Sequence, residues 1–150
     1  MDRPRPAEVQ DWIARHDPLR IDPLTDVVVE ACGHEVRSVY AETYWLSIIG
    51  PSALWALRRL TAWLEAEPAG FSVELELLAK ELGLGHGVSR NSPIVRCLAR
   101  LVAFDLARLS PGGLVVARAV PPLALRHLRR LPYHLAAAHD AGVRPAGDAA

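Results

Sequence analysis

The sequence has little of what a secreted or membrane-spanning protein needs. Two cysteines among 150 residues are too few for a disulfide framework. The longest uncharged stretch, residues 43–57, is interrupted by Gly50 and Pro51 and falls short of the roughly 20 apolar residues of a membrane-spanning helix. The first residues lack the apolar core of a secretory signal. We therefore expect a compact cytoplasmic protein with no membrane association.

Motifs of enzymes and metal sites are also missing. Cysteine and histidine are present, but there is no paired Cys-x-x-Cys, and Cys97 falls on an apolar helical stripe, which favours a buried thiol. The histidines after residue 126 lack the four-residue spacing of a helical zinc motif. The glycines in residues 83–87 follow a predicted helix and are not accompanied by the Gly-Lys-Ser/Thr of a phosphate loop. We predict no catalytic residue, no metal and no cofactor.

Charge is balanced over the whole chain but not along it. The 17 basic and 17 acidic side chains cancel. Residues 1–88 hold 8 basic and 14 acidic side chains, whereas residues 89–150 hold 9 basic and 3 acidic ones. In residues 89–130 the only acid is Asp105. This stretch is suited to phosphate or to an acidic partner; alternatively, its arginines pair with the acidic first half within the fold.

Proline and glycine divide the first half into segments whose apolar residues have helical spacing. A helix is predicted for residues 6–15, and Asp22-Pro23 has the residue types of a second helix start. Residues 38–49 favour another helix, and a longer one begins at Pro51 and stops before residue 68. Ser72 is the expected N-cap of the next helix, which the glycines after residue 82 end.

The second half adds one more amphipathic helix and a strand pair. Ser92-Pro93 repeats the signal of a cap followed by proline, and a buried stripe begins at Ile94. Residues 106–109 and 114–120 are strand-like and flank a turn of residues 110–113, which predicts a β-hairpin. A helical C-terminal region is expected to bend at Pro132, and residues 141–150 to form a frayed tail.

The order helix, helix, helix, hairpin and several local residues resemble a winged helix-turn-helix DNA-binding domain. Leu78-Ala79 followed by Leu82-Gly83 resembles the second helix of bacterial winged helix-turn-helix regulators, in which the alanine allows close helix crossing and the glycine opens the turn. The resemblance covers residues 51–120. The connection after residue 83 is longer than the three or four residues of a tight turn.

Further residues carry the same resemblance. Val88-Ser89-Arg90 is similar to the turn before the recognition helix, and Asp105 stands where that helix usually ends in a left-handed glycine. The whole chain looks like small uncharacterised winged-helix proteins of high-GC Gram-positive bacteria. Residues 44–54 are also similar to the start of the N-terminal winged helix of DnaD-type replication-initiation proteins.

These patterns predict a mostly α fold, a three-helix core plus a β-hairpin wing with additional N- and C-terminal helices. We divide the chain into a helical extension (residues 1–50), the winged helix-turn-helix (51–120), a C-terminal helical region (121–140) and a flexible tail (141–150). The resemblance implies a small DNA-binding protein that regulates transcription, docking a recognition helix (about 92–104) and a wing (106–120) on double-stranded DNA.

The predicted DNA contacts are basic and polar residues of the recognition helix and its neighbours. Arg96 and Arg100 would read base edges, and the others would meet phosphate. The whole set is Arg90, Asn91, Ser92, Arg96, Arg100, Arg108 and Arg118. Dimerisation would present two recognition helices to a palindromic site. The alternative function is a non-catalytic winged-helix module for protein interaction or dimerisation, associated with replication. The large aromatic residues support this alternative, because interfaces are enriched in Trp and Tyr.

Overall fold

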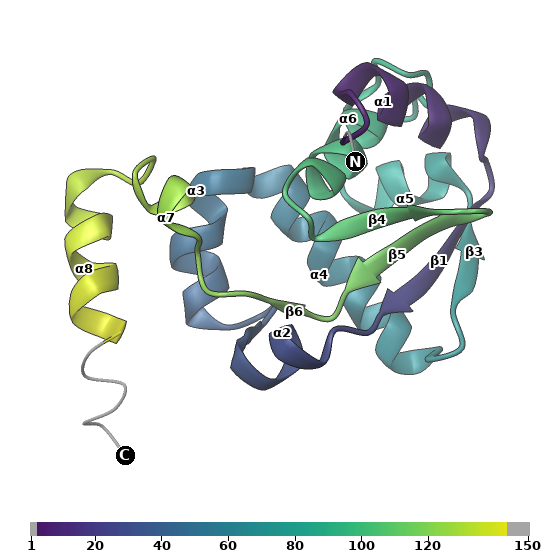
Figure 1. The fold of residues 1–150 in the computed structure, drawn as a ribbon. Helices are drawn as coiled ribbons and strands as arrows, with labels where there is room; N and C mark the ends of the chain where they lie inside the picture. Colours follow the sequence, from purple (N-terminus) through teal and green to yellow (C-terminus); the bar gives the residue numbers. More distant parts are fainter. Residues whose placement is uncertain (1–2, 144–150) are drawn as a thin grey trace.

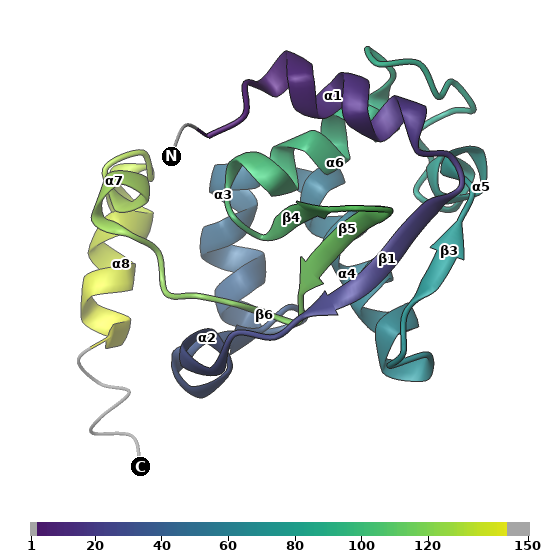
Figure 2. The ribbon, with the colours of Figure 1, turned by 45° about the vertical axis from the view of Figure 1, so that its right-hand side comes forward.

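The computed structural model describes residues 3–143, which form a small β-sheet with helices packed on it (Figure 1). The helices are α1 (Pro6–Arg15), α2 (Val27–Cys32), the π-helix η1 (Ala41–Trp45), α3 (Leu46–Ile49), α4 (Pro51–Ala66), α5 (Leu75–Glu81), α6 (Pro93–Ala103), α7 (Leu125–Leu128) and α8 (Tyr133–Val143). The strands are β1 (Leu19–Leu24), β2 (His34–Glu35), β3 (Phe71–Val73), β4 (Ala107–Ser110), β5 (Gly113–Ala117) and β6 (Ala119–Val120). Helix α1 lies along α6, on the side away from the sheet, in both ribbon views (Figures 1 and 2).

Strand β1 joins the two halves of the sheet, whose order is β3-β1-β5-β4. It pairs antiparallel with β3 and parallel with β5, where Arg20 lies opposite Gly113. Leu19 and Ile21 are fully buried, whereas Arg20 and Asp22, on the other face, pair with each other at 2.9 Å. One face of the sheet therefore packs on the helices and the other carries polar side chains.

The fold is mixed α/β, and the prediction of a mostly α fold with a two-stranded wing is wrong. Helix accounts for 53% of the structure and strand for 16%, and the sheet has four strands with both parallel and antiparallel pairs. The added strands are β1, from the segment that we expected to be a helical extension, and β3, from the connection between α4 and α5. Both depend on pairing with distant segments, which local apolar spacing does not encode.

Two predicted helix starts are also wrong. Asp22 lies inside β1, and the following helix begins at Val27 with Asp26 as its cap. The Asp26 carboxylate accepts the N–H groups of Val28 and Val29 at 3.0 and 3.2 Å. Ser72 lies in β3, and α5 begins at Leu75. The Leu75 N–H donates to the carboxylate of Asp17 at 3.1 Å, so a residue 58 positions away provides the cap.

Several other local predictions for residues 38–120 are confirmed, but the second hairpin strand is shorter than the predicted 114–120: β5 ends at Ala117, and Ala119–Val120 form β6, which pairs with β2. Helices α4 and α6 begin at the proline after Gly50 and after Ser92, where proline at the first helical position is favourable. The hairpin is present, with Leu109 opposite Leu114. Asp105 has a φ of 60°, so it adopts the left-handed conformation expected at the end of α6.

The C-terminal region is helical and split near Pro132, as predicted. Helix α8 continues to Val143, and the rest of the predicted tail lies outside the described residues. Strand β6 pairs with β2, so the chain returns to the N-terminal segment before α7. The division at residues 50, 120 and 140 stays a prediction.

Candidate functional site

Helix α6 forms the floor of an open groove of about 540 Å³. One wall is α1, through Pro6 and Gln10, and the other is the junction of α3 and α4, residues 49–53. Arg96 and Arg100, one helical turn apart, lie along the floor with Ala103. We call this surface the α6 groove.

The α6 groove has a positive lining. None of the described residues that line it is acidic, and both charged ones are arginines. The groove also receives the N-terminus of α4, a 16-residue helix with no acidic side chain in its first turn and no side-chain cap. The N–H groups of Ser52 and Ala53 have no partner within that helix, and its dipole adds positive potential. Negative charge is therefore favoured in this groove.

The two groove arginines differ in how firmly they are held. Arg100 donates from Nη2 to the carbonyl oxygen of Ile48 at 3.1 Å, and its guanidinium carbon lies 5.5 Å from the centre of the Phe104 ring. Within residues 3–143 no acidic side chain pairs with Arg96, which is exposed. Arg100 is thus positioned before any ligand arrives, and Arg96 is free to follow one.

Helix α1 is a permanent wall of the groove rather than a removable lid. Val9 and Ile13 are 3% and 0% exposed, and burial of such side chains contributes about 1.5–3 kcal/mol each. Two exposed ion pairs lie around the helix: Arg3, which precedes it, pairs with Asp105 at 2.6 Å, and Asp11 in its middle pairs with Arg90 at 3.3 Å. The packing of α1 on α6 therefore opposes its removal when a ligand approaches α6.

The predicted contacts just before α6 serve the fold in this structure. Arg90 is the partner of Asp11 on α1. The Ser92 side chain is 6% exposed, and its hydroxyl donates to the carbonyl oxygen of Ser89 at 2.6 Å. Asn91 is exposed. None of these three residues lines the α6 groove, and only Asn91 takes no part in these contacts.

The predicted wing arginines lie away from the groove, near α2. Arg118 pairs with Glu30 of α2 at 2.5 Å. Arg108 lines a hollow of about 120 Å³ together with three acids, Asp26, Glu30 and Asp105. Figures 1 and 2 both show α6 above and α2 below the strands β4 and β5. The structure therefore does not bring the wing arginines together with Arg96 and Arg100.

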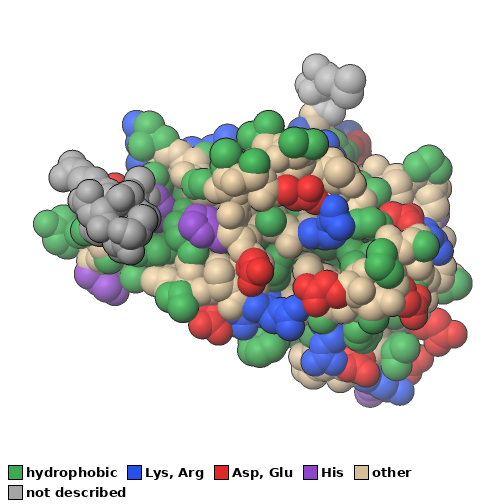
Figure 3. All heavy atoms as spheres, turned by 90° about the horizontal axis from the view of Figure 1, so that it is seen from below, with side chains coloured by type: hydrophobic (Ala, Val, Ile, Leu, Met, Phe, Trp, Pro, Cys, Tyr) green, Lys and Arg blue, Asp and Glu red, His purple; other side chains and the backbone are tan. Residues whose placement is uncertain are grey.

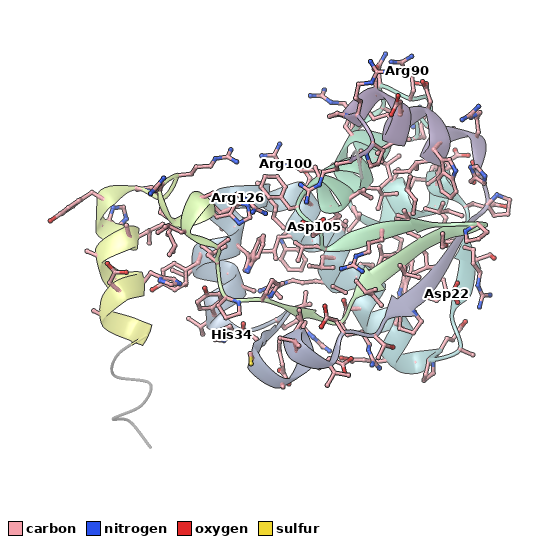
Figure 4. The ribbon with its side chains drawn as sticks, viewed as in Figure 1. Asp22, His34, Arg90, Arg100, Asp105 and Arg126 are labelled. Carbon is pink, nitrogen blue, oxygen red and sulfur yellow. The ribbon has the colours of Figure 1, made fainter. Side chains whose placement is uncertain are left out.

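Charges of opposite sign are also interspersed elsewhere. The face seen from below shows basic and acidic side chains next to each other (Figure 3). Exposed pairs of this kind include Arg37 with Glu65 and Lys80 with Glu76. Such pairs neutralise local potential and contribute little stability. Arg100 and Arg126 (Figure 4) differ from these residues, because neither forms an ion pair with any residue of 3–143, whereas Arg90 in the same view pairs with Asp11.

Sequence reasoning missed two parts of the groove: Gln10 of α1, and the N-terminus of α4 with Ser52. The signal for α4 was present, because Gly50-Pro51 predicts a helix start without a polar cap. Nothing in the sequence indicates that this helix end faces α6. Gln10 lies on α1, whose place in the fold is set by tertiary packing of Val9 and Ile13.

The cysteine and histidine residues offer no chemistry at the groove. Burial raises the pKa of the Cys97 thiol to about 12, so this groove-lining thiol stays protonated at neutral pH. Among the residues that the structure describes, no three His, Cys, Asp or Glu side chains are grouped to hold a metal ion. The charged side chains that line the groove are therefore Arg96 and Arg100 alone, among the residues that the structure describes.

Comparison with known proteins gives no relative. No family model matches the chain, and no curated protein and no solved structure matches it significantly. Across residues 3–143 there is no helix with the length and hydropathy to cross a bilayer. The function must therefore be argued from the site itself.

Proposed function

We propose that this protein binds nucleic acid and holds the phosphate backbone of a single strand in the α6 groove. The observation that carries the proposal is the α6 groove itself, in which Arg96 and Arg100 lie beside a helix N-terminus with no acid in the lining. Phosphate is the anion for which arginine and free backbone N–H groups are suited. The resemblance of residues 51–120 to DNA-binding domains, which stays a prediction, points to the same ligand class.

The position of α1 favours a single strand over a duplex. The major groove of B-DNA is about 12 Å wide and admits one helix of about 10–12 Å diameter. Helix α6 is packed between α1 and α4, and most of its residues are buried. Entry of α6 into a major groove would require α1 to leave, which the burial of Val9 and Ile13 opposes. A single strand needs only the exposed stripe of Arg96 and Arg100.

Replacing the groove arginines by glutamine tests this proposal. Hydrogen bonds to charged groups are worth about 1.5–3 kcal/mol each, so losing even one should weaken binding at least about tenfold. The substitutions are Arg96→Gln and Arg100→Gln, separately and together. The probe is a fluorescein-labelled oligothymidylate of about 16 nucleotides, titrated by fluorescence anisotropy.

A matched control separates the site from net charge. Arg37→Gln with Arg118→Gln removes the same charge from residues that pair with glutamates elsewhere. This control should bind like the wild type. If the groove variant and the control lost the same amount of affinity, only net charge would matter, and binding of the strand in the α6 groove would be refuted. Arg96→Gln is the cleanest single change, because Arg96 makes no ion pair within residues 3–143.

Regulation of transcription, a cytoplasmic location and dimerisation stay part of the proposal as expectations. A labelled duplex of the same sequence, titrated beside the single strand, tests the duplex DNA that the sequence predicts. Tighter binding of the duplex would favour the predicted regulator and would require a docking mode other than insertion of α6.

The surface around Trp55 favours protein interaction as a second candidate function. Trp55 is 55% exposed, and the guanidinium of Arg58 lies 5.2 Å from the centre of its ring. These residues line a hollow of about 300 Å³ together with Arg37 and Arg59. All three arginines pair with glutamates, so the hollow is suited to an uncharged side chain. A wild-type mass equal to that of Trp55→Ala at high concentration would exclude self-association through Trp55.

A further inference from the structure

Beyond the α6 groove, the arginines of the α7 segment form a second basic surface. Arg126, Arg129 and Arg130 are all exposed. No acidic side chain within residues 3–143 forms an ion pair with any of them. Three uncompensated arginines within five residues create a concentrated positive potential.

Phe104 connects this surface to the α6 groove. The guanidinium carbon of Arg130 lies 5.8 Å from the centre of the Phe104 ring, and that of Arg100 lies 5.5 Å from the same ring. The ring of His127 in α7 is 5.3 Å from it. One aromatic side chain at the end of α6 thus contacts cations from both elements, and Figure 4 shows Arg100 and Arg126 on the same upper edge.

His127 lies between the α7 arginines in the sequence and is buried beside them. Its side chain is 7% exposed, and Nδ1 has no hydrogen-bond partner. Burial lowers the pKa of His127, and the neighbouring charges of Arg126 and Arg130 lower it further, whereas Asp105 acts in the opposite direction. Asp105 is the acid close to this surface, and it pairs with Arg3.

The α7 segment is anchored on both sides, so its backbone has a defined position. Before α7, Trp45 donates from Nε1 to the carbonyl oxygen of Pro121 at 2.8 Å, and the N–H of Leu123 donates to the Tyr40 hydroxyl at 2.8 Å. After α7, the Tyr40 hydroxyl lies 2.7 Å from Nε2 of His139 in α8. A basic segment that is fixed in this way loses little backbone conformational entropy when a ligand binds.

We propose that a single strand of nucleic acid leaves the α6 groove over Phe104 and continues along α7, where Arg126, Arg129 and Arg130 bind its phosphates. This inference rests on the proposed function and extends its footprint. Phe104 marks the crossing point, and the guanidiniums on both sides of it form a continuous path. The α7 arginines should therefore contribute to affinity as the groove arginines do.

The test is the triple variant Arg126→Gln, Arg129→Gln and Arg130→Gln, titrated with the labelled oligothymidylate of about 16 nucleotides at several salt concentrations. For single strands, the slope of log K against log salt changes by about 0.7 for each phosphate contact. The triple variant should bind at least about tenfold more weakly, with a slope smaller by about 2. The control makes the same charge change by replacing Arg37, Arg59 and Arg118 with glutamine; all three of these arginines pair with glutamates.

Three results decide between the proposals. Weak binding by the triple variant, normal binding by the control and recovery in the Arg→Lys version of the triple support the α7 path. If the triple variant binds with the same affinity as the control, while the double variant Arg96→Gln with Arg100→Gln binds weakly, the α7 path is overturned and the proposal of binding in the α6 groove stands. No salt-sensitive binding by the wild type overturns both. Thermal melting of each variant verifies that the fold is intact.

Discussion

Replacing Gly113 by alanine should separate β1 from β5, because no space for a methyl group exists between the two strands. A Cβ atom at this position would lie 1.8 Å from the carbonyl oxygen of Arg20 and 2.7 Å from its nitrogen. Non-bonded heavy atoms prefer about 3.5–4.0 Å, so the backbones would have to move apart by well over 1 Å. Both obstructing atoms belong to the backbone, which cannot turn away as a side chain would.

The expected cost is about 3 kcal/mol or more, at the upper end for overpacking, because the parallel pairing that runs from Arg20 to Leu24 is disturbed. For a domain of this size the melting temperature should fall by about 6–12 °C. Gly112→Ala is the matched control, since its Cβ would meet only the Cβ of Arg20 at 3.9 Å, an ordinary contact. Circular dichroism melting and urea unfolding measure both variants.

Equal stability of the Gly113→Ala and Gly112→Ala variants would refute the placement of β1 beside β5. It would also remove the basis for the mixed sheet. A loss confined to Gly113→Ala would support the strand order β3-β1-β5-β4.

Three more predictions concern the pH dependence of stability, thiol reactivity and α1. Burial lowers the pKa of His127 below its usual 6.5, so the unfolded chain binds this proton more tightly, and stability should fall as the pH drops through about 6.5. Urea unfolding at about pH 7.5 and about pH 5.5 should show a smaller fall for His127→Leu than for the wild type, and an equal fall would contradict the assignment. Cys32 is exposed and Cys97 is buried, so a thiol reagent should label Cys32 in the native protein and both cysteines in denaturant; native labelling of Cys97 would disprove its burial. Ile13→Ala should cost about 2–5 kcal/mol, measured by urea unfolding, because Ile13 is 0% exposed; a loss below about 0.5 kcal/mol would show that α1 is a loose cover.

Local signals in the sequence were sufficient for the elements that are defined by their own residues. Proline after Gly50 and after Ser92 marks two helix starts, because its fixed φ and missing N–H suit only the first helical position. Residues 110–113 predict the hairpin turn for a similar reason. Asp105 could be assigned a left-handed backbone because few other residues tolerate it.

Strand β1 could not be predicted because its pairing partners are far away in the sequence. Its residues 19–24 contain proline and aspartate, which are rare in strands, and Asp22-Pro23 is typical of a helix start. Tertiary pairing with β3 and β5 overrides that local preference. The cap of α5 by Asp17 is missed for the same reason.

The sequence predicted the basic residues of the candidate site, but it did not predict the groove in which they lie. Arg96 and Arg100 follow from helical spacing, but the walls of the groove depend on where α1 and α4 pack. The charge asymmetry along the chain left two interpretations open: the arginines bind an anionic partner, or they pair with the acidic first half. The structure contains examples of such pairing, Arg90 with Asp11 and Arg118 with Glu30.

The most direct test of the central proposal is a competition titration of the wild-type protein. A labelled single strand bound at low salt is displaced with unlabelled single strand or with the same sequence as a duplex, and the titration is repeated at higher salt. The α6 groove predicts salt-sensitive binding and stronger displacement by the single strand, because α1 keeps α6 out of a major groove. Stronger displacement by the duplex, or affinity that does not change with salt, would contradict the proposal.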